Sequence, residues 1–349
     1  MKIAHIFWGL GTGGIETMLV NIANEQARLG HEVHIIIIND LVNETLQKKL
    51  YPEVHFICLK RVLGSKSPWP VIKLNCFLLI IRPDIIHFHE VQLINYVFQI
   101  WRNKSVLTVH DVLRSNQDKG YSKFRQVYAI SDSVRDDMQQ IHRIDAKTIF
   151  NGIPVRVFHQ RKEKKKVVNL IQVSRIIHEK KGQDILLQAF SNLVNKGYRS
   201  LTLTFVGEGE SESYLRNMAK ELGVENRVHF AGLWQQEYLF THLAEFDLFV
   251  QPSRYEGFGL TVAEAMAAKV PVLVSANQGP MEIIGQGKYG YSFENGNVDD
   301  CMEKLQWLIT NGIDLDMIEN AYRYVNQMFD VRMTAKRYIE EYKAICSNE

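Results

Sequence analysis

Two glutamates, Glu256 and Glu264, stand eight residues apart in the part of the sequence best equipped for chemistry. Between them lie two glycines and the start of a helix rich in small residues, in the stretch Gly257-Phe258-Gly259-Leu260. Backbone amides at a helix N-terminus favour phosphate and sugar oxygens. Helix capping would account for Glu264 alone, but not for Glu256 and the glycines with it. The pattern predicts a site for an oxygen-rich ligand at this loop.

Two cations stand on an earlier loop, between an expected strand and an expected helix. They are Arg175 and Lys181, in the stretch from Ser174 to Gly182. Arginine offers a planar fork of donors and lysine a compact charge, a combination that suits a diphosphate. Taken alone, two cations on a loop are also explained as surface charge.

The first glycine-rich loop, Gly9 to Gly14, follows the first expected strand and satisfies the spacing G-x-G-x-x-G. Asp40 ends the second expected strand, about where a ribose-binding carboxylate stands in a dinucleotide site. The loop is therefore compatible with a nucleotide-dependent oxidoreductase. It is also compatible with a turn that binds no ligand, because the spacing only lets backbone amides approach an anion.

These loops need strands and helices to position them, and short β-branched runs alternate with amphipathic stretches along the chain. Runs that are apolar throughout, such as residues 35–38, are typical of parallel strands covered on both faces. The pattern predicts an α/β fold of two Rossmann-like, doubly wound domains facing a central cleft. The expected strands are 2–7, 32–38, 85–89, 106–109, 126–130 and 147–150, then 167–173, 201–206, 228–231, 248–251 and 272–275.

A charged run from Arg161 to Lys166 separates the two series, and we interpret it as a solvated linker or domain edge. We expect an N-terminal domain over residues 1–155 and a C-terminal domain over residues 165–330. The tail, about residues 331–349, is expected to form an amphipathic helix that packs back on the first domain. Two domains also suit a chain of 349 residues, since single cores rarely grow beyond roughly 250–300 residues.

Composition narrows the class of protein. The chain is 46% hydrophobic and 23% charged with a net charge of +2, which argues against a nucleic-acid binder. Cys58, Cys76, Cys301 and Cys346 are far apart and are expected to be reduced thiols. The sequence shows no signal-peptide pattern and no apolar run near the roughly 20 residues of a spanning helix. We expect a cytoplasmic protein.

The Glu256-x7-Glu264 pattern resembles the signature of retaining glycosyltransferases with the GT-B fold, specifically family 4 (glycosyl transferases group 1). The resemblance covers essentially the whole chain, and its fragments follow the order of the family. The further fragments are residues 13–16, 83–89, 108–111, 130–134 and 151–153, Arg175 with Lys181-Gly182, and residues 206–209 and 228–232.

In such enzymes the C-terminal domain holds a nucleotide sugar. The resemblance implies that Arg175 and Lys181 neutralise its diphosphate and so stabilise the leaving group. It implies that Glu256 contacts hydroxyls of the transferred sugar and that Glu264 accepts hydrogen bonds from the ribose. The residues expected to line the sugar with their backbone, or to frame the ribose and base, are Gly257, Phe258, Gly259, Leu260, Gly207 and Leu233.

On the N-terminal side, the resemblance implies that Gly13 and Gly14 let the first loop approach the phosphate or acceptor. His110 resembles the family histidine near the C6 side of the sugar, where it would donate a hydrogen bond and shape the oxocarbenium-like state. The alternative is a hydrogen-bonded histidine at a strand end. His87 and His89 share this ambiguity and are interpreted as structural.

We expect neither a cofactor nor a metal ion. The donor is expected to be a nucleoside-diphosphate sugar, and a UDP-sugar is favoured on family grounds alone. Asp314-Leu315-Asp316 matches the D-x-D triplet of metal-dependent transferases, but no buried strand precedes it, so we interpret it as coincidental. Retention normally suggests a carboxylate nucleophile. The family pattern supplies no agreed one, and a same-face displacement assisted by the leaving phosphate is the usual proposal.

The acceptor is expected to be a glycan or a lipid-linked molecule. Residues 60–70 are basic, include Trp69 and lead into the apolar residues 71–81. These features suit peripheral contact with the inner face of an anionic membrane. They equally suit an ordinary loop followed by a core helix.

We therefore expect a hexosyltransferase-type enzyme (EC 2.4) that transfers a sugar with retention. Its expected role is in the biosynthesis of a capsule, exopolysaccharide or lipopolysaccharide. An oxidoreductase that uses the loop from Gly9 to Gly14 is one alternative. A non-catalytic sugar-nucleotide-binding protein is the other.

Overall fold

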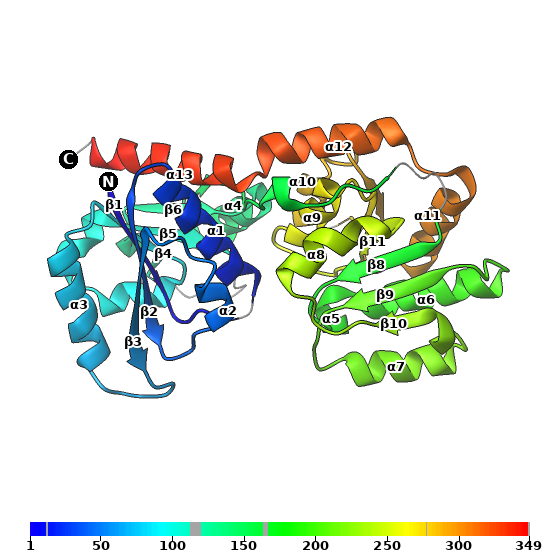
Figure 1. The fold of residues 1–349 in the computed structure, drawn as a ribbon, viewed down its shortest axis with the longest axis horizontal. Coiled ribbons are helices and arrows are strands. Elements are labelled where there is room, and N and C mark those ends of the chain that lie inside the picture. Colours follow the sequence, from blue (N-terminus) through cyan, green and yellow to red (C-terminus); the bar gives the residue numbers. More distant parts are fainter. Residues whose placement is uncertain (12, 112–119, 163–166, 277, 348–349) are drawn as a thin grey trace. The chain divides into compact units, whose positions relative to one another are not determined.

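The chain folds into two compact α/β units, in a computed structural model that describes residues 1–11, 13–111, 120–162, 167–276 and 278–347 (Figure 1). Unit 1 combines Met1–Ile153 with the segment from Asp330 onward, and unit 2 is Pro154–Phe329. The C-terminal segment therefore belongs to unit 1, although all of unit 2 lies between the two parts in sequence.

The sheet of unit 1 has seven parallel strands in the order β3-β2-β1-β4-β5-β6-β7. The strand order reverses beside β1, which pairs with β2 on one side and β4 on the other. The strands are β1 (Lys2–Phe7), β2 (Glu32–Asn39), β3 (Val54–Arg61), β4 (Ile85–Phe88), β5 (Ser105–Val109), β6 (Gln126–Ala129) and β7 (Lys147–Thr148).

Helices α1 and α13 of unit 1 lie side by side (Figure 1). Met18 and Ile22 of α1 join Tyr338 and Tyr342 of α13 in one buried cluster with Ile3. The helices are α1 (Gly14–Arg28), α2 (Glu44–Gln47), α3 (Trp69–Ile81), α4 (Asp132–His142) and α13 (Val331–Cys346), with 3-10 turns η1 (Val91–Tyr96), η2 (Gln99–Lys104) and η3 (Tyr121–Lys123).

The sheet of unit 2 has six parallel strands in the order β10-β9-β8-β11-β12-β13, with the reversal between β8 and β11. The strands are β8 (Asn169–Val173), β9 (Thr202–Val206), β10 (Val228–Phe230), β11 (Leu248–Gln251), β12 (Val272–Ser275) and β13 (Tyr291–Phe293). The helices are α5 (His178–Lys181), α6 (Gln183–Asn195), α7 (Glu212–Glu221), α8 (Gln236–His242), α9 (Leu260–Ala267), α10 (Gln278–Ile283), α11 (Val298–Asn311) and α12 (Leu315–Met328), with turns η4 (Val155–Val157), η5 (Glu225–Arg227) and η6 (Leu243–Glu245).

The expectation of a solvated charged run is wrong at Arg161. Its side chain is buried, and its Nη2 lies 3.2 Å from Asp247 Oδ1. The other oxygen of Asp247 accepts from the backbone N–H groups of Val168 and Asn169. A buried arginine needs such a partner, because an uncompensated charge in the interior is strongly destabilising. Residues 163–166 of the run lie outside the described residues.

In the part of the chain that the structure describes, no helix has both the length and the apolar character needed to cross a membrane.

Candidate active site

The candidate residues of unit 2 lie on the loops and helices that follow the carboxyl ends of four adjacent strands. Arg175 and Lys181 follow β8, Gly207 follows β9, Leu233 follows β10 and Glu256 follows β11. The strand order reverses between β8 and β11, and ligands of open parallel sheets bind at such a reversal.

Lys181 and Glu256 form an ion pair with 2.5 Å between Nζ and Oε2. Both side chains are largely buried, with 14% and 18% of their surface exposed. Gln251, at the end of β11, donates its Nε2–H to the same Glu256 oxygen at 3.3 Å and to Ser253 Oγ at 2.9 Å. The resemblance led us to assign Lys181 to a diphosphate and Glu256 to a sugar, and it did not reveal that the two side chains bind each other.

Two buried glutamines fix the loop that carries the cations. Gln172 donates its Nε2–H to the carbonyl of Lys181 at 3.0 Å, and Gln183 donates its own to the carbonyl of Arg175 at 2.9 Å. The Arg175 side chain is exposed and makes no hydrogen bond or ion pair to any residue that the structure describes. A rigid backbone therefore presents a guanidinium that is available to a ligand.

Two glycines let these loops pack closely. Gly182 has φ +66°, and a Cβ there would collide with the carbonyl oxygen of Pro252 in the loop after β11. Gly207 has φ +129°, and a Cβ there would collide with the carbonyl oxygen of Ser174 in the loop after β8. Only glycine suits both the positive φ and the close approach.

Helix α9 begins directly after Gly259, which has φ +100°, and no side chain caps it. Behind the loop lies Gly279, where a Cβ would be 2.6 Å from the carbonyl carbon of Gly257. The ring of Phe258 is buried against Phe329, with 5.6 Å between ring centroids. Gly279 and the buried Phe258 ring thus hold the loop backbone in place at the start of α9. Gly279 was not predicted, because its role depends on a neighbour that is distant in sequence.

Glu264 lies inside α9, and burial raises the pKa of its carboxyl group to about 8. Among the described residues, its side chain makes no hydrogen bond and no ion pair. The residue is half-buried, and a carboxyl group withdrawn from water without a hydrogen-bond partner is costly in free energy. The carboxyl group is therefore available to a ligand that offers hydrogen-bond donors.

Arg254 is a further charged residue of this edge, and we assigned no role to it from the sequence. It forms two hydrogen bonds with the Asp184 carboxylate, at 2.8 and 2.7 Å, and one with the carbonyl of His178 at 2.7 Å. These bonds tie the loop after β11 to α5 and α6. The role shown by these contacts is structural.

In unit 1, Gly13 and Gly14 lie at the start of α1, while Thr12 of the same loop is outside the described residues. Gly13 has an extended backbone, and a Cβ there would collide with the carboxylate of Glu16. A carboxylate so close to the loop repels a phosphate and favours a ligand that presents hydroxyl groups. Glu16 was part of the matched fragment, but its position over the loop was not foreseen.

His110 follows β5 and ends a chain of hydrogen bonds across three strands. Gln26 Oε1 lies 2.7 Å from His5 Nε2, His5 Nδ1 lies 3.1 Å from His89 Nε2, and His89 Nδ1 lies 3.2 Å from His110 Nε2. Burial lowers the pKa of His5 and of His110 to about 4, so these rings are neutral at pH 7.

The tautomers follow from this network, because a neutral imidazole has one donor and one acceptor nitrogen. An acceptor oxygen at Gln26 assigns each proton of the chain to Nε2. His110 then donates to His89, and its own Nδ1 is an acceptor that is buried and has no partner among the described residues. The resemblance instead led us to expect a hydrogen-bond donor at His110.

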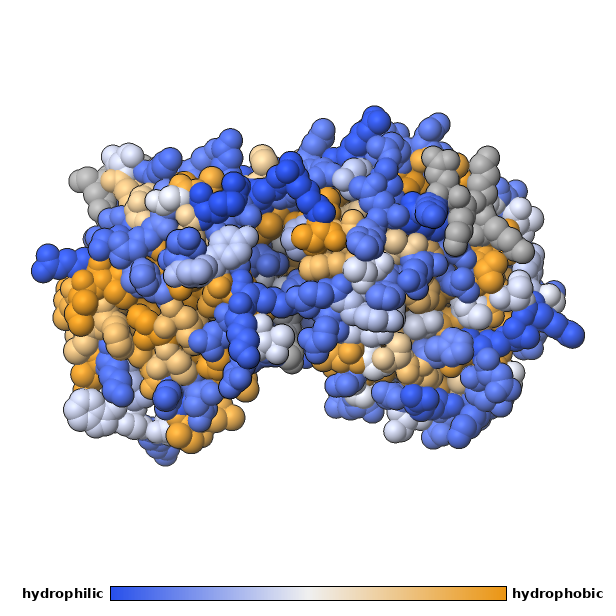
Figure 2. All heavy atoms as spheres, in the orientation of Figure 1, coloured by the Kyte–Doolittle hydropathy of each residue, from blue (hydrophilic) through white to orange (hydrophobic). Residues whose placement is uncertain are grey.

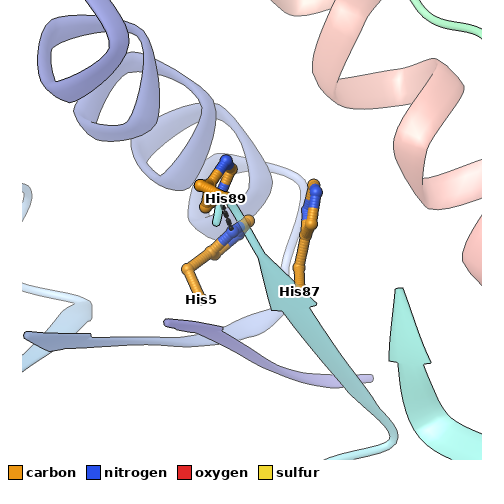
Figure 3. Close-up of side chains that lie close together, drawn as sticks. All are labelled: His5, His87 and His89. Atoms are coloured by element: carbon orange, nitrogen blue, oxygen red, sulfur yellow. Dashed lines mark hydrogen bonds between the residues drawn. The ribbon is translucent and has the colours of Figure 1, made fainter. Parts of the chain in front are cut away.

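His5, His87 and His89 project from neighbouring strands into the core of unit 1 (Figure 3). Their nitrogens lie close enough to hold a metal ion, within 4.8 Å of one another. However, each nitrogen already has a protein partner. The two of His87 lie 2.7 Å from Thr108 Oγ1 and 2.5 Å from the Tyr342 hydroxyl. The cluster is complete as a hydrogen-bonded core.

Asp314, of the D-x-D triplet, is the N-cap of α12. Its Oδ1 accepts from the backbone N–H groups of Asp316 and Met317, at 3.0 and 3.1 Å. Helix capping accounts for an aspartate at this position.

Two family descriptions match adjoining parts of the chain. "Glycosyltransferase Family 4" matches residues 12–157, and "Glycosyl transferases group 1" matches residues 155–324. This chain is a group 1 glycosyltransferase.

Two curated relatives align with the glycosyltransferase over almost its whole length. An uncharacterized glycosyltransferase of Methanocaldococcus jannaschii is 25% identical over 98% of this chain and 98% of its own. The N-acetyl-alpha-D-glucosaminyl L-malate synthase of Bacillus anthracis is 26% identical over 95% of this chain and 93% of its own.

Solved structures show the GT-B fold of the glycosyltransferase. A glycosyltransferase from Rickettsia africae has a TM-score of 0.81 at 21% identity, covering 100% of this chain and 99% of its own. HepE of Anabaena, solved in complex with UDP and glucose, has a TM-score of 0.80 at 22% identity, covering 98% and 99%. The family decides against both alternatives, the oxidoreductase and the non-catalytic binding protein. The Glu16 carboxylate beside Gly13 gives a physical reason against a dinucleotide phosphate at the first loop.

Proposed function

We propose that this glycosyltransferase takes a sugar from a nucleoside-diphosphate sugar and transfers it, with retention, to a glycan or lipid-linked acceptor of a cell-surface polysaccharide. The observation that carries the proposal is the group of charged residues at one sheet edge of unit 2. An exposed Arg175, the Lys181–Glu256 pair and an unpartnered Glu264 follow two strands beside the order reversal.

The proposed donor contacts divide by chemistry. Arg175 and Lys181 bind the diphosphate and stabilise the charge that develops as the glycosidic bond breaks. Glu256 binds hydroxyls of the transferred sugar, and Glu264 binds the vicinal hydroxyls of the ribose. The backbone at Gly257, Phe258, Gly259 and Leu260 lines the sugar, and the loops at Gly207 and Leu233 frame the ribose and base.

Unit 1 is the proposed acceptor side. Glu16 and the glycines Gly13 and Gly14 present an oxygen acceptor at the start of α1, which suits a hydroxyl-bearing ligand better than a phosphate. His110 offers Nδ1 to a sugar hydroxyl, held in this tautomer by His89 and His5.

The relatives support a UDP-sugar and a surface glycan. HepE was solved with UDP-glucose. Similar proteins include a poly(ribitol-phosphate) alpha-N-acetylglucosaminyltransferase of Staphylococcus aureus and a lipopolysaccharide core biosynthesis glycosyltransferase of Rhizobium meliloti. We extend these two properties to the present chain as part of the proposal.

Calorimetric titration of the full chain against UDP, GDP, ADP and NAD tests the donor assignment. We expect one nucleoside diphosphate to bind best and NAD not to bind at this site. Excess chelator should leave both binding and turnover intact, because the proposal needs no metal ion. Binding of NAD alone, or turnover that returns only with added Mn²⁺ or Mg²⁺, would contradict it. The anomeric configuration of the product, measured by NMR, tests retention.

A further inference from the structure

Helix α3 has an apolar face toward solvent. Its exposed residues are Trp69, Ile72, Lys73, Cys76, Leu79 and Ile80, and we call this set the α3 face. Their spacing of three or four residues places them on one side of the helix. The opposite side is apolar too, with Leu74 and Leu78 fully buried. Surface helices of globular proteins normally turn charged and polar residues to solvent, so an outward apolar stripe needs an explanation.

Neighbouring segments extend the α3 face. Leu63, in the connection that leads into α3, is 80% exposed. Phe98 is 49% exposed, and the buried Asn75 of α3 holds it in place by accepting from its backbone N–H at 2.8 Å. Figure 2 shows apolar side chains gathered over the region of α3, at the left of the view. Single exposed apolar residues are ordinary, whereas a contiguous patch marks an interaction site.

The charged residues in and around α3 are all basic. Residues 54–83 contain five basic residues and no acidic one. Of the basic residues, Lys60, Lys66, Lys73 and Arg82 form no ion pair with any residue of the described ranges. The segment thus combines exposed aliphatic side chains, a tryptophan that is 64% exposed, and free cations.

These features distinguish between a protein and a lipid bilayer as the partner of the α3 face. Cores of protein interfaces are depleted in lysine, and a second copy of this chain would bring its own positive charges against the first. An anionic bilayer accepts all three components, because tryptophan prefers the headgroup level, aliphatic side chains enter the acyl boundary, and lysines reach the phosphates. The 13 residues of α3 are too few to span a bilayer, so the helix would lie in its plane.

We propose that the α3 face docks this glycosyltransferase on the surface of a bilayer that contains anionic lipids. The benefit of docking for transfer to a lipid-linked acceptor rests on the proposed function, but the docking itself does not. The site consists of the α3 face, which includes Lys73, together with Leu63, Phe98 and the other three free cations.

Vesicle flotation of the full chain tests this docking. We expect binding to vesicles of phosphatidylcholine with about 30% phosphatidylglycerol, weaker binding to phosphatidylcholine alone, and a loss of binding as salt is raised. The double variant Leu79→Ser/Ile80→Ser should bind at least about tenfold more weakly, since two apolar side chains no longer enter the bilayer. Lys73→Glu should weaken binding only to the anionic vesicles.

Trp307→Ser is the matched control, because Trp307 of α11 is 52% exposed but belongs to unit 2 and is not part of the α3 face. It should bind vesicles as the wild type does. All substituted positions are exposed, and unchanged thermal unfolding verifies that each variant folds. Equal vesicle binding by wild type and the double variant would overturn the proposal. So would a wild-type dimer that the double variant converts to monomer.

Nucleotide titration of the same variants separates this proposal from the proposed function. The double variant should bind nucleoside diphosphate with wild-type affinity. Absent vesicle binding with intact nucleotide binding would overturn the docking alone. Vesicle binding by a chain that binds no nucleoside diphosphate would overturn the proposed donor site and leave the docking supported.

Discussion

Four acidic or basic residues at the sheet edge of unit 2 lie in three different environments. Lys181 and Glu256 neutralise each other, Arg175 is solvated, and burial keeps the proton on Glu264 near neutral pH. A diphosphate that binds Lys181 must therefore compete with or share the Glu256 carboxylate. Diphosphate binding at this edge replaces the Lys181–Glu256 ion pair with contacts to the ligand. The free energy of binding is therefore smaller than the contacts in the complex alone suggest.

A double-variant cycle tests this exchange. Lys181→Met should lower the free energy of unfolding by about 1–3 kcal/mol, because Glu256 stays largely buried without its cation. It should also weaken nucleoside-diphosphate binding at least about tenfold, since charge-assisted hydrogen bonds contribute roughly 1.5–3 kcal/mol. Lys181→Met/Glu256→Gln should recover the stability but not the affinity. Denaturant unfolding and calorimetry measure the two quantities. Recovered affinity in the double variant would show that Lys181 acts only through Glu256.

The protonated carboxyl group of Glu264 predicts that donor binding changes with pH. Ribose hydroxyls that donate to this group favour its ionised form, so binding near pH 7 should release a proton from a group whose pKa is about 8. Titration in buffers of different ionisation enthalpy measures this release. Glu264→Gln should abolish it and weaken donor binding by about tenfold or more. If this variant released as many protons as the wild type, a residue other than Glu264 would be the group that loses a proton on donor binding.

At the scale of elements, hydrophobic patterning predicted the buried strands well. Expected strands at residues 2–7, 248–251 and 272–275 coincide with β1, β11 and β12, and most others differ by one or two residues at an end. β3 and β13 were missed. Both are edge strands of mixed burial, and their alternating or short apolar patterns lack the continuous run that identifies a strand covered on both faces.

Only the parts of the candidate site that are formed by short, continuous sequence motifs could be predicted from the sequence. Loops after strands and the start of α9 could be identified from glycines and charges in the sequence. Contacts between distant segments could not, such as Lys181 with Glu256 or Gly279 with Gly257. The glutamines Gln172 and Gln251 look like ordinary strand-end polar residues until the partners of their amides are seen.

Helix α13 completes the core of unit 1 with hydroxyl groups as well as apolar surface. Tyr342→Phe removes the hydroxyl that lies 2.5 Å from His87 Nδ1 and leaves a buried nitrogen without a partner. We expect the free energy of unfolding of unit 1 to fall by about 1–3 kcal/mol. Tyr51→Phe is the control, since that side chain is exposed and its change should stay within about 0.5 kcal/mol. Equal effects in denaturant unfolding would contradict the role of the Tyr342 hydroxyl.

In the whole molecule, the stabilities of the two units are expected to change with pH in opposite directions. In unit 1, the pKa values of His5 and His110 lie near 4, against 6.5 in the unfolded chain. The unfolded chain therefore binds protons first as the pH falls, and unit 1 should lose stability between pH 6.5 and 4. In unit 2, Glu264 has a pKa of about 8 against 4.5 unfolded. Its contribution is present below pH 4.5 and should be lost as the pH rises to 8.

Scanning calorimetry between pH 5 and 8 measures the pH dependence of the unfolding transition of each unit and so tests this prediction. Acidification should lower the transition of unit 1, by on the order of 1 kcal/mol for each pH unit and each histidine. Tyr342→Phe identifies that transition, because it destabilises unit 1 alone. The stability gain of Glu264→Gln relative to wild type should be larger at pH 8 than at pH 5, and an effect that is independent of pH would contradict the raised pKa.

The route of the chain has a consequence for how the protein is made. Unit 2 is complete once residue 329 has left the ribosome, whereas the core of unit 1 still lacks Tyr338 and Tyr342. The hydrogen bonds of Thr108 and His87 with these two hydroxyl groups can form only after the last segment has emerged. The first 153 residues are thus synthesised earliest and finished last. During translation, the second half of the chain can reach its native state before the first, and a stall near the end would leave unit 1 as the part open to proteases.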